Sequence, residues 1–365
     1  MGKTPRSNFR PDYLVTPGEV LEDYLESLSM TQSELALRTG LAKKTINEIV
    51  KCKSPITLET ALKLERTLGR PAHFWNNLEI QYQEDKVRLE EKEKMQTNLD
   101  WLKKVPVKKL IDFRWIPKIG NKIEQLEAVL RFFGVDSPQQ WKTIWKEYQV
   151  EYRQTQQFEK NAVAVSAWLR QGELEAKKIY CEPFDKKKFQ QILVDIRNLA
   201  REQEPKIFIP KLEALCASAG VAVVFVPELP NTGVCGATRW IGDKAIIQLS
   251  LRYKTNDHLW FTFFHEAGHL IKHGKKDIFI EGKNRDGEKE SQADVFAQNI
   301  LIPQKAFSRF RSSSSYTLGD IRRFANEIDI APGIVVGRLQ HEGVIDYNIG
   351  NNLKVRYRWN TNRFT

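Results

Sequence analysis

The chain has 365 residues, a formal net charge of +11 and 41% hydrophobic residues. This length allows two or three domains, and the apolar fraction is enough for a sizeable core. The sequence contains neither a stretch of about 18 apolar residues nor an apolar segment at its start, so we expect no membrane span and no secretory signal. The four cysteines have no C-x-x-C spacing, which argues against a disulfide framework and against a cysteine zinc site. We therefore expect a soluble, cytoplasmic protein without a membrane partner.

A run of short amphipathic helices is predicted over residues 13–83. The segment Thr31–Glu34 has the pattern of a capping box that opens the second helix, which Gly40 ends. After a short turn, residues 43–50 are predicted to form a third helix with its apolar side chains inward. Thr57 caps a fourth helix. Two helices joined by a short Gly-containing turn, the second of them basic, are typical of a helix-turn-helix.

Basic residues are concentrated between residues 38 and 53, where Glu48 is the one acidic residue. A local basic patch on a nearly neutral domain is typical of a small DNA-binding domain, whereas diffuse charge that only keeps the protein in solution is the alternative. We expect the third helix to enter the major groove and Gln32 to contact backbone phosphate. The candidate DNA-binding residues are Gln32, Lys43, Lys44, Thr45, Asn47 and Lys51.

Several short motifs in this region occur together, namely Thr16–Leu21, Thr31-Gln32, Ala36, Ile46-Asn47, Ile56-Thr57, Ala61 and Phe74–Glu79. Over about residues 13–83 they resemble the XRE-type HigA antitoxin family. The resemblance implies a five-helix domain that binds double-stranded operator DNA, and a homodimer is a further expectation. One departure is Ala42, where the family usually has a serine that caps the recognition helix. We therefore expect a weak cap at this position.

The next part of the chain is helical by pattern but carries no catalytic constellation. Residues 84–94 are mostly charged and predict a solvated helix that links the N-terminal region to the rest of the chain. From residue 99 to about 204 the pattern is helical and rich in Trp and Gln, with helices expected at 126–133, 141–152, 163–169 and 189–199. We interpret this segment as a spacer or as a sensing and docking domain.

A change in composition after residue 204 indicates strands. The apolar run 220–227 predicts a buried strand. Residues 236–240 and 244–250 predict two more strands, with a hairpin turn at Gly242-Asp243. An extended substrate could bind to the strand region 236–250 by backbone pairing.

The segment His265-Glu-Ala-Gly-His269 follows an almost wholly apolar run. Residues four apart lie on one face of a helix, so His265 and His269 can bind one metal ion from adjacent turns. Glu266 lies between them and can act as the catalytic base on water at that ion. The alternative is that both histidines are ordinary core residues.

A third ligand is predicted on the next helix, which apolar spacing places before Pro303. Glu290 and Asp294 share one face of this helix. A His/His/Glu set leaves the fourth tetrahedral position of Zn²⁺ open, as in catalytic sites. Asp294 is then placed to accept a hydrogen bond from the second ring nitrogen of a ligand histidine. Ordinary solvated helix charges are the alternative for both carboxylates.

Four further residues and one loop have weaker interpretations. We expect His273 to be structural or to support the ligands, and His258 and Arg252 are weak candidates for stabilising an oxyanion. Cys235 could offer a thiolate to the open zinc position, but a small apolar strand residue is the favoured interpretation. The charged loop 274–289 lies between the second and third ligands. We hypothesise that it is a mobile lid, which a partner bound to the middle domain opens; an ordinary surface loop is the alternative.

The tail has a helical pattern over residues 321–339, with Pro332 between two helices. It has the form of half of another helix-turn-helix, but packing against the preceding domain is the favoured interpretation. The alternative is a second nucleic-acid-binding surface, formed by Arg322, Arg323 and Arg338.

The motif Phe264–His269, the pattern of residues 290–297 and Pro303 together resemble the ImmA/IrrE metallopeptidase family over about residues 205–345. The resemblance implies zinc bound by His265, His269 and Glu290, Glu266 as the base, and a repressor-like regulator or toxin–antitoxin component as substrate. The expected fold is multidomain and mainly α, with a small mixed α+β zincin-like peptidase domain. The expected domains are the helix-turn-helix domain at 1–83, a helical middle domain at 84–204, and the peptidase domain with its tail at 205–365.

The expected function is that of a DNA-binding transcriptional regulator fused to a zinc-dependent endopeptidase that cleaves a regulatory protein. The alternative is an antitoxin-like repressor whose metal domain senses or docks a partner with little proteolysis. A purely structural zinc protein is a third, weaker interpretation, because the ligand set leaves one coordination position open.

Overall fold

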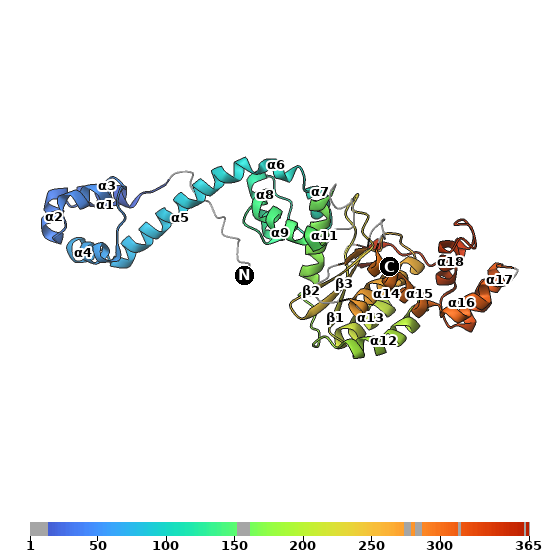
Figure 1. The fold of residues 1–365 in the computed structure, drawn as a ribbon. Coiled ribbons are helices and arrows are strands. Elements are labelled where there is room, and N and C mark those ends of the chain that lie inside the picture. Colours follow the sequence, from blue (N-terminus) through green and yellow to red (C-terminus); the bar gives the residue numbers. More distant parts are fainter. Residues whose placement is uncertain are drawn as a thin grey trace, which may run out of the picture. The chain divides into compact units, whose positions relative to one another are not determined.

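The computed structural model describes residues 14–151, 161–273, 279–281, 287–312, 315–360 and 363–364, and the chain divides into two compact units, Met1–Asn98 and Leu99–Thr365 (Figure 1). Each unit has an apolar core of its own. Among the described residues, no helix combines the length and the apolar character that crossing a membrane would require.

The first unit is helical, and its described part contains the five expected helices: α1 (Pro17–Ser27), α2 (Gln32–Thr39), α3 (Lys43–Val50), α4 (Leu58–Leu68) and α5 (Ala72–Thr97). Side chains from every one of them form one apolar core, which includes Leu21, Leu35, Ile46, Leu64 and Trp75. Left-handed glycines end α2 and α4, because Gly40 and Gly69 adopt φ angles of 69° and 73° that other residues rarely take. The predicted bounds of α2, α3 and α4 are confirmed.

The capping of these helices differs from the prediction in one respect. At α2 the Thr31 hydroxyl accepts a hydrogen bond from the Glu34 backbone N–H, as expected. The reciprocal half of the box is replaced, since the Glu34 carboxylate accepts hydrogen bonds from the Arg38 guanidinium instead. A complete capping box is found at α1, between Thr16 and Glu19.

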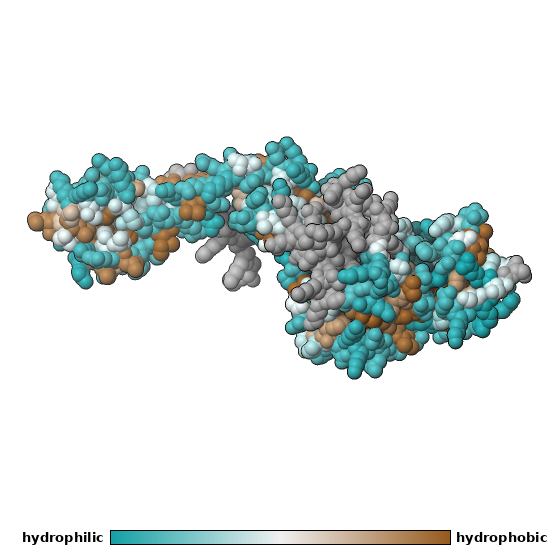
Figure 2. All heavy atoms as spheres, in the orientation of Figure 1, coloured by the Kyte–Doolittle hydropathy of each residue, from teal (hydrophilic) through white to brown (hydrophobic). Residues whose placement is uncertain are grey.

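The charged segment 84–94 is helical and mostly exposed, as predicted, and it is the continuation of α5. Trp75 is the one buried residue of this helix, and the rest of its surface is mostly hydrophilic (Figure 2). Pairs at i,i+4 spacing such as Arg88–Glu84 support the exposed part. The helix therefore continues without a break because its charged residues are good helix formers.

The second unit begins with the helices α6 (Leu99–Leu102), α7 (Val107–Asp112), α8 (Lys122–Phe133), α9 (Pro138–Glu151), α11 (Ala162–Ala176), α12 (Lys186–Leu199) and α13 (Pro205–Ser218). Aromatic side chains pack between the first of these, with Trp101 in contact with both Phe133 and Trp141. The four helices predicted between residues 126 and 199 are all present. Helix α13 was not predicted.

A mixed sheet follows, formed by β1 (Val221–Phe225), β2 (Gly236–Ile241), β3 (Lys244–Leu249) and β4 (Phe279–Glu281) in the order β1-β3-β2-β4. The pair β1–β3 is parallel, and β2 is antiparallel to β3 and to β4. The turn between β2 and β3 lies at Gly242-Asp243, as predicted. The short strand β4 was not predicted.

Helices α11 and α12 pack closely with the sheet and the helices after it. Phe189, Leu193 and Ile196 of α12 belong to the same core as Val221 and Val223 of β1. On α11, main-chain oxygens of Trp168 and Leu169 accept hydrogen bonds from Gln248 and Arg239 of the sheet. A division of the chain at residue 204 remains a prediction, and a cut at that point would remove part of this core.

The C-terminal part contains α14 (Asn256–Lys272), α15 (Glu288–Leu301), α16 (Gln304–Arg311), α17 (Leu318–Glu327), α18 (Pro332–His341), a 3-10 turn η1 (Asn351–Leu353), and the strands β5 (Trp359–Asn360) and β6 (Arg363–Phe364). Ile321 of α17 and Val335 of α18 are fully buried in the core that also holds Phe263 of α14. The tail therefore packs on the sheet domain, as the favoured interpretation had it. The expected fold class, multidomain and mainly α with a small mixed sheet, is confirmed.

Candidate metal centre and nucleic-acid interface

Helix α14 carries the predicted metal-binding motif in the middle of the second unit. It is the most deeply buried helix of this unit, and apolar residues such as Phe263 and Phe264 anchor it in the core. His265 and Glu266 have no exposed surface, and His269 is 2% exposed. Three polar side chains so deeply buried require partners, because burial of unpaired polar groups costs free energy.

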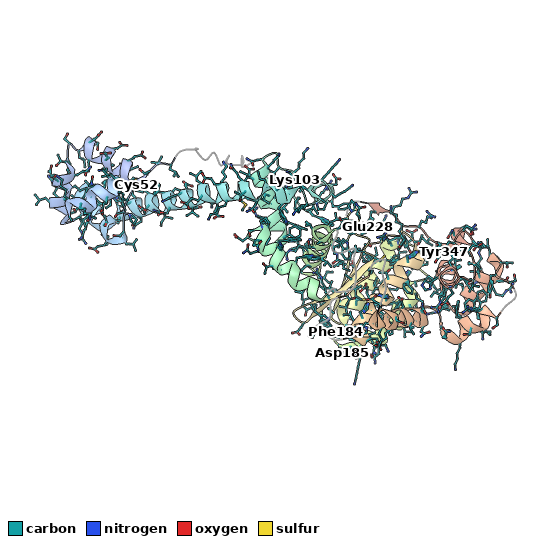
Figure 3. The ribbon with its side chains drawn as sticks, turned by 45° about the horizontal axis from the view of Figure 1, so that its top comes forward. Cys52, Lys103, Phe184, Asp185, Glu228 and Tyr347 are labelled. Atoms are coloured by element: carbon teal, nitrogen blue, oxygen red, sulfur yellow. The ribbon has the colours of Figure 1, made fainter. Side chains whose placement is uncertain are left out.

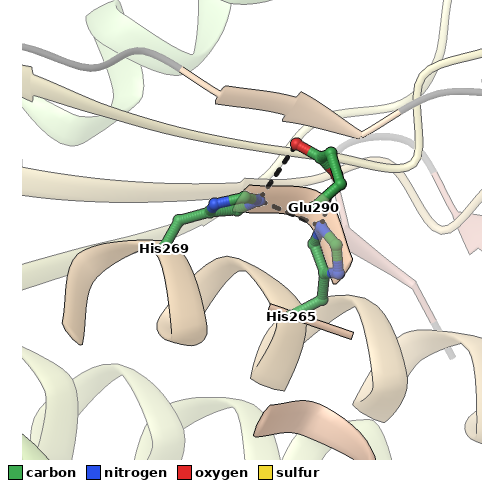
Figure 4. Close-up of side chains that lie close together, drawn as sticks. All are labelled: His265, His269 and Glu290. Atoms are coloured by element: carbon green, nitrogen blue, oxygen red, sulfur yellow. Dashed lines mark hydrogen bonds and ion pairs between the residues drawn. The ribbon is translucent and has the colours of Figure 1, made fainter. Parts of the chain in front are cut away.

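Glu290 of the neighbouring helix α15 brings a third polar group to the two histidines (Figure 4). Nε2 of His265 lies 3.0 Å from Nε2 of His269 and 3.1 Å from Oε2 of Glu290. Nε2 of His269 lies 3.4 Å from Oε1 of Glu290. Among the described residues, these three side chains form a group whose ligand atoms all lie within 4.8 Å of one another.

The chemistry of this group fits a zinc ion. Zinc binds imidazole nitrogen and carboxylate oxygen at roughly 2.0–2.2 Å. Three ligand atoms that lie within 4.8 Å of one another can therefore share one ion placed between them. Nε2 of His265 faces both a second imidazole nitrogen at 3.0 Å and a carboxylate oxygen at 3.1 Å. A single ring N–H can be directed at only one of these two atoms, whereas a metal ion can accept an electron pair from all three groups. The structure therefore provides a His/Glu group able to hold a metal.

Asp294 lies one turn after Glu290 and contacts the other side of His265. Its Oδ1 is 2.9 Å from Nδ1 of His265, so it accepts a hydrogen bond when that nitrogen carries the proton. This leaves Nε2 of His265 as an acceptor directed at the group. The structure thus brings together all the residues predicted for the metal site.

The protonation of the group also suits metal binding. Burial by itself would raise the pKa of Glu290, but the neighbouring imidazoles of His265 and His269 outweigh it and hold the pKa far below its usual range. Burial lowers the pKa of His269. Both groups therefore favour the deprotonated forms that bind metal ions.

Glu266 is held by residues of β2 that the sequence did not single out. The Thr238 hydroxyl lies 2.6 Å from Oε2 of Glu266 and 3.0 Å from its main-chain oxygen. Gly236 allows the close approach, because a Cβ at this position would lie 2.6 Å from Oε1 of Glu266. No spacing rule relates these residues to Glu266. The one signal in the sequence is Gly236 at the start of β2, because a glycine in a strand can mark a close approach of the backbone to another group.

The strand that we expected to receive a substrate is partly covered. Residues Gly236–Thr238 of β2 pair with β4, so this stretch, which lies beside Glu266, is not a free edge. The lid hypothesis placed on loop 274–289 falls largely outside the described residues, which include only 279–281 and 287–289 of it. The described part shows that this loop contributes a strand to the sheet.

The candidate DNA-binding residues lie on α2, α3 and the turn after α3. Lys43, Lys44 and Lys51 are exposed, and Gln32, Thr45 and Asn47 are half-buried. Ile46 and Ile49 hold the opposite face of α3 in the core. As predicted, α3 lacks a side-chain cap, because Ala42 occupies the N-cap position without a side-chain hydrogen bond.

Two family models match these two regions. The model described as Helix-turn-helix matches residues 21–75, and the peptidase-family model described as IrrE N-terminal-like domain matches residues 218–339. The second match contains all of His265, Glu266, His269, Glu290 and Asp294. This chain joins an XRE-type helix-turn-helix domain to an IrrE-like metallopeptidase-family domain.

Individual relatives are similar to a short part of the chain. Virulence-associated protein I of Dichelobacter nodosus is 34% identical over 86 residues, which are 23% of this chain and 77% of that protein. An uncharacterized HTH-type transcriptional regulator of Haemophilus influenzae is 41% identical over 63 residues, 17% of this chain and 59% of that protein. A solved addiction module antidote protein of a HigA family from Coxiella burnetii is 27% identical, with 25% of this chain and 96% of that chain covered and a TM-score of 0.22.

The other candidate residues of the IrrE-like domain lie outside the metal group. His273 approaches the main-chain oxygen of Lys289 at 3.2 Å, which ties α14 to the start of α15. The rings of His258 and Tyr253 stack at 4.2 Å, and Arg252 lies 3.8 Å from Glu228. Cys235 is buried and forms no disulfide. None of these residues belongs to the metal group found among the described residues.

Proposed function

We propose that this protein is a DNA-binding transcriptional regulator whose IrrE-like domain is a zinc-dependent endopeptidase that cleaves a regulatory protein. The observation that supports this most is the convergence of His265, His269 and Glu290, with Glu266 next to the first of them on the same buried helix. A group of this kind with a neighbouring carboxylate is the arrangement of catalytic zinc sites rather than structural ones.

His265, His269 and Glu290 would hold the zinc, and Asp294 would fix the ring orientation of His265. When bound, zinc would supply Lewis-acid chemistry, polarising the scissile carbonyl and making water acidic enough to lose a proton near neutral pH. Glu266 accepts that proton and delivers it to the leaving amine. Thr238 donates to one oxygen of Glu266 and so fixes the direction of the carboxylate for this transfer.

The helix-turn-helix domain supports DNA binding, and we propose operator DNA as its ligand, with α3 in the major groove. Lys44 and Asn47 would read base edges, and Gln32 and Lys51 would contact phosphate. A second copy of the chain would suit an operator with two half-sites. The protein substrate is proposed to be a repressor or a component of a toxin–antitoxin pair.

The experiment that tests the peptidase is incubation of the zinc-loaded chain with a lysate of its own cells, followed by mass spectrometry of new N-termini. We expect fragments with the unaltered chain and none with Glu266→Gln, which should still bind zinc. Asp195→Asn is a matched control, because it removes an exposed carboxylate of α12. Fragments that persist with Glu266→Gln would overturn the mechanism.

Addition of a chelator, with operator binding and partner association measured beside the fragments, separates the alternative function. If the domain senses or docks a partner without cutting it, a chelator should change operator binding or partner association while no fragments appear.

A further inference from the structure

A cavity of about 210 Å³ lies beside the metal group in the IrrE-like domain. Helices α14, α15 and α18 and the segment after α18 enclose it. Its lining residues are Asp257, His258, Phe261, Gln298, Leu301, Ile302, Ile334, Gly337, Arg338, Gln340, His341, Tyr347, Asn351 and Lys354. No residue of this cavity belongs to the metal group, and the proposed mechanism does not use it.

Three residues place the cavity close to the metal group. Phe261 lines it one helical turn before His265, and the two ring centroids are 6.2 Å apart. Gln298 lines it one turn after Asp294, the partner of His265. Arg338 lines it and lies close enough to Asp294 for their charges to interact. A helical turn rises about 5.4 Å, so a side chain next to a bond cleaved at the metal group can reach the cavity.

The size and the apolar lining of the cavity fit a large side chain of a bound peptide. Leu301, Ile302 and Ile334 line the cavity and are buried, while Phe261 is half-buried although most of α14 around it is fully buried. An apolar cavity of about 150 Å³ is enough to bind benzene. A volume of about 210 Å³ can therefore hold an aromatic ring or a long aliphatic chain.

The charges around the cavity favour an uncharged occupant. Lys354 and Asp257 form a buried ion pair at 2.6 Å, with side chains 9% and 7% exposed. Arg338 is paired with Glu342 at 2.8 Å. The charges of these four residues cancel in two ion pairs, so a charged side chain entering here would lose its hydration without meeting a net charge of opposite sign.

Arg338 can also contact the main chain of a peptide. Its Nε and Nη1 are buried and have no hydrogen-bond partner among the residues that the structure describes. The Phe307 ring, 4.8 Å from the guanidinium carbon, holds the side chain in place. Two N–H groups in this position can donate to a main-chain carbonyl oxygen of a bound peptide.

We propose that this cavity is a specificity pocket that receives a large uncharged side chain, aromatic or long aliphatic, of the residue flanking the cleaved bond. This proposal rests on the proposed peptidase function for its biological meaning, but the pocket can be tested separately. Tyr347, labelled in Figure 3, lines the cavity and is 74% exposed, so the occupant can enter from solvent beside it.

The first test uses a degenerate peptide library with blocked N-termini and the zinc-loaded full chain. Pooled sequencing of the products should show Phe, Tyr, Leu and Met enriched several-fold over Asp, Lys and Gly next to the cut. Gln298→Trp fills the cavity from a half-buried position and should shift the preference to small residues. Asn299→Trp adds the same bulk at the exposed neighbouring position and should leave the preference unchanged.

The second test does not depend on cleavage. N-acetyl-phenylalanine amide and N-acetyl-aspartate amide are titrated into the Glu266→Gln full chain and observed by ligand-detected NMR. The phenylalanine amide should bind at least about tenfold more tightly, which corresponds to about 1.4 kcal/mol, and Gln298→Trp should remove this difference. Binding without any cleavage would support the pocket and overturn the proposed function. Cleavage without side-chain preference, a preference for acidic residues, or equal binding of the two amides would overturn the pocket.

Discussion

The Thr238 hydroxyl lies 2.6 Å from Oε2 of Glu266, and both residues are almost wholly buried. One residue lies on strand β2 and the other on helix α14, so this hydrogen bond joins the sheet to the helix at the carboxylate proposed as the catalytic base. A hydrogen bond from a neutral donor to a buried carboxylate fixes its direction. Thr238 is therefore a positioning residue for Glu266.

Replacement of Thr238 by valine keeps the shape of the side chain and removes the donor. We expect Thr238→Val to lower kcat about tenfold or more, the size of effect seen when supporting partners of metal sites are removed. KM should change little, because Thr238 does not contact substrate in the proposed mechanism. Steady-state kinetics on a peptide selected from the degenerate library measures both constants.

Thr238→Ser is the matched control, since it keeps the hydroxyl and should recover most of kcat. Bound zinc, measured by atomic absorption, should be the same in all three proteins. A serine variant as slow as the valine variant would show that Thr238 acts through packing and not through its hydrogen bond.

The metal site was predictable because its residues repeat at helical spacing along the sequence. His265 and His269 are four residues apart, as are Glu290 and Asp294, and helix geometry alone places each pair on one face. Thr238 and Arg338 were missed as parts of the site because they approach it across the tertiary structure. No regular spacing in sequence links them to the motif.

Secondary structure was missed where local pattern and tertiary context disagree. Helix α13 contains Pro210 in its interior, a residue that usually indicates a break. Strand β4 has three residues in a charged, Gly-rich loop, and it forms by pairing with Gly236–Thr238 of β2. The reciprocal half of the predicted capping box at Thr31 is lost because Arg38, one turn after Glu34, takes the carboxylate.

The hypothesis that a partner bound to the middle domain opens loop 274–289 needs a test that keeps the core of the second unit intact. Deletion of residues 1–200 would remove α12 and with it Phe189, Leu193 and Ile196 from the core. Lost activity would then report unfolding. Substitutions in the full chain avoid this problem.

Asp294 should strengthen zinc binding without touching the metal. Its hydrogen bond with Nδ1 of His265 selects the tautomer whose Nε2 can bind the ion. We expect Asp294→Ala to weaken zinc affinity about 10–100-fold, measured by competition with a chromophoric chelator. Asp195→Ala, an exposed change on α12, should leave the affinity unchanged. Equal affinities of Asp294→Ala and the unaltered chain would contradict the assigned role.

Ala42→Ser should stabilise the helix-turn-helix domain. Ala42 is at the N-cap of α3 and offers no side-chain acceptor to the first backbone N–H groups. A serine there can supply one, and N-cap serines contribute about 0.5–2 kcal/mol relative to alanine. Urea unfolding followed by a probe in the first unit measures the gain. Ala42→Val has no hydroxyl and should show none, and an equal gain with valine would rule out capping as the cause.

Residues of α3 should differ in how they contribute to DNA binding. Lys44→Ala and Asn47→Ala should each weaken binding to a specific operator by about 1–3 kcal/mol if they contact base edges. Lys51→Ala should weaken all sequences alike and reduce the salt dependence, because a phosphate contact carries no sequence information. Fluorescence anisotropy at several salt concentrations separates the two effects.

Lys86→Ala is the matched control for these variants, since Lys86 is an exposed residue on α5, outside the proposed interface. It should change neither affinity nor salt dependence. Failure of the full chain to bind any DNA from the region of its own gene at low salt would remove the proposed DNA-binding role.

Glu173 should make the stability of the second unit depend on pH. Burial by itself would raise the pKa of Glu173, but hydrogen bonds from Lys177 and Arg170 outweigh it, so that its pKa in the folded state lies below the ordinary value of 4.5. Lys177 and Arg170 lie 2.6 and 2.7 Å from its Oε1. A carboxyl group whose pKa is lowered by folding stabilises the protein above the unfolded pKa, and this contribution disappears as pH falls through the folded pKa.

The unaltered chain should therefore be more stable than Glu173→Gln at pH 7, and the difference should shrink as pH falls below about 4.5. Thermal unfolding of both proteins at a series of pH values between 7 and 3 measures this difference. Glutamine keeps the size of the side chain and can still accept one hydrogen bond, so a loss due to packing would be the same at every pH. A difference that stays constant across the series would show that the charge of Glu173 does not stabilise the fold.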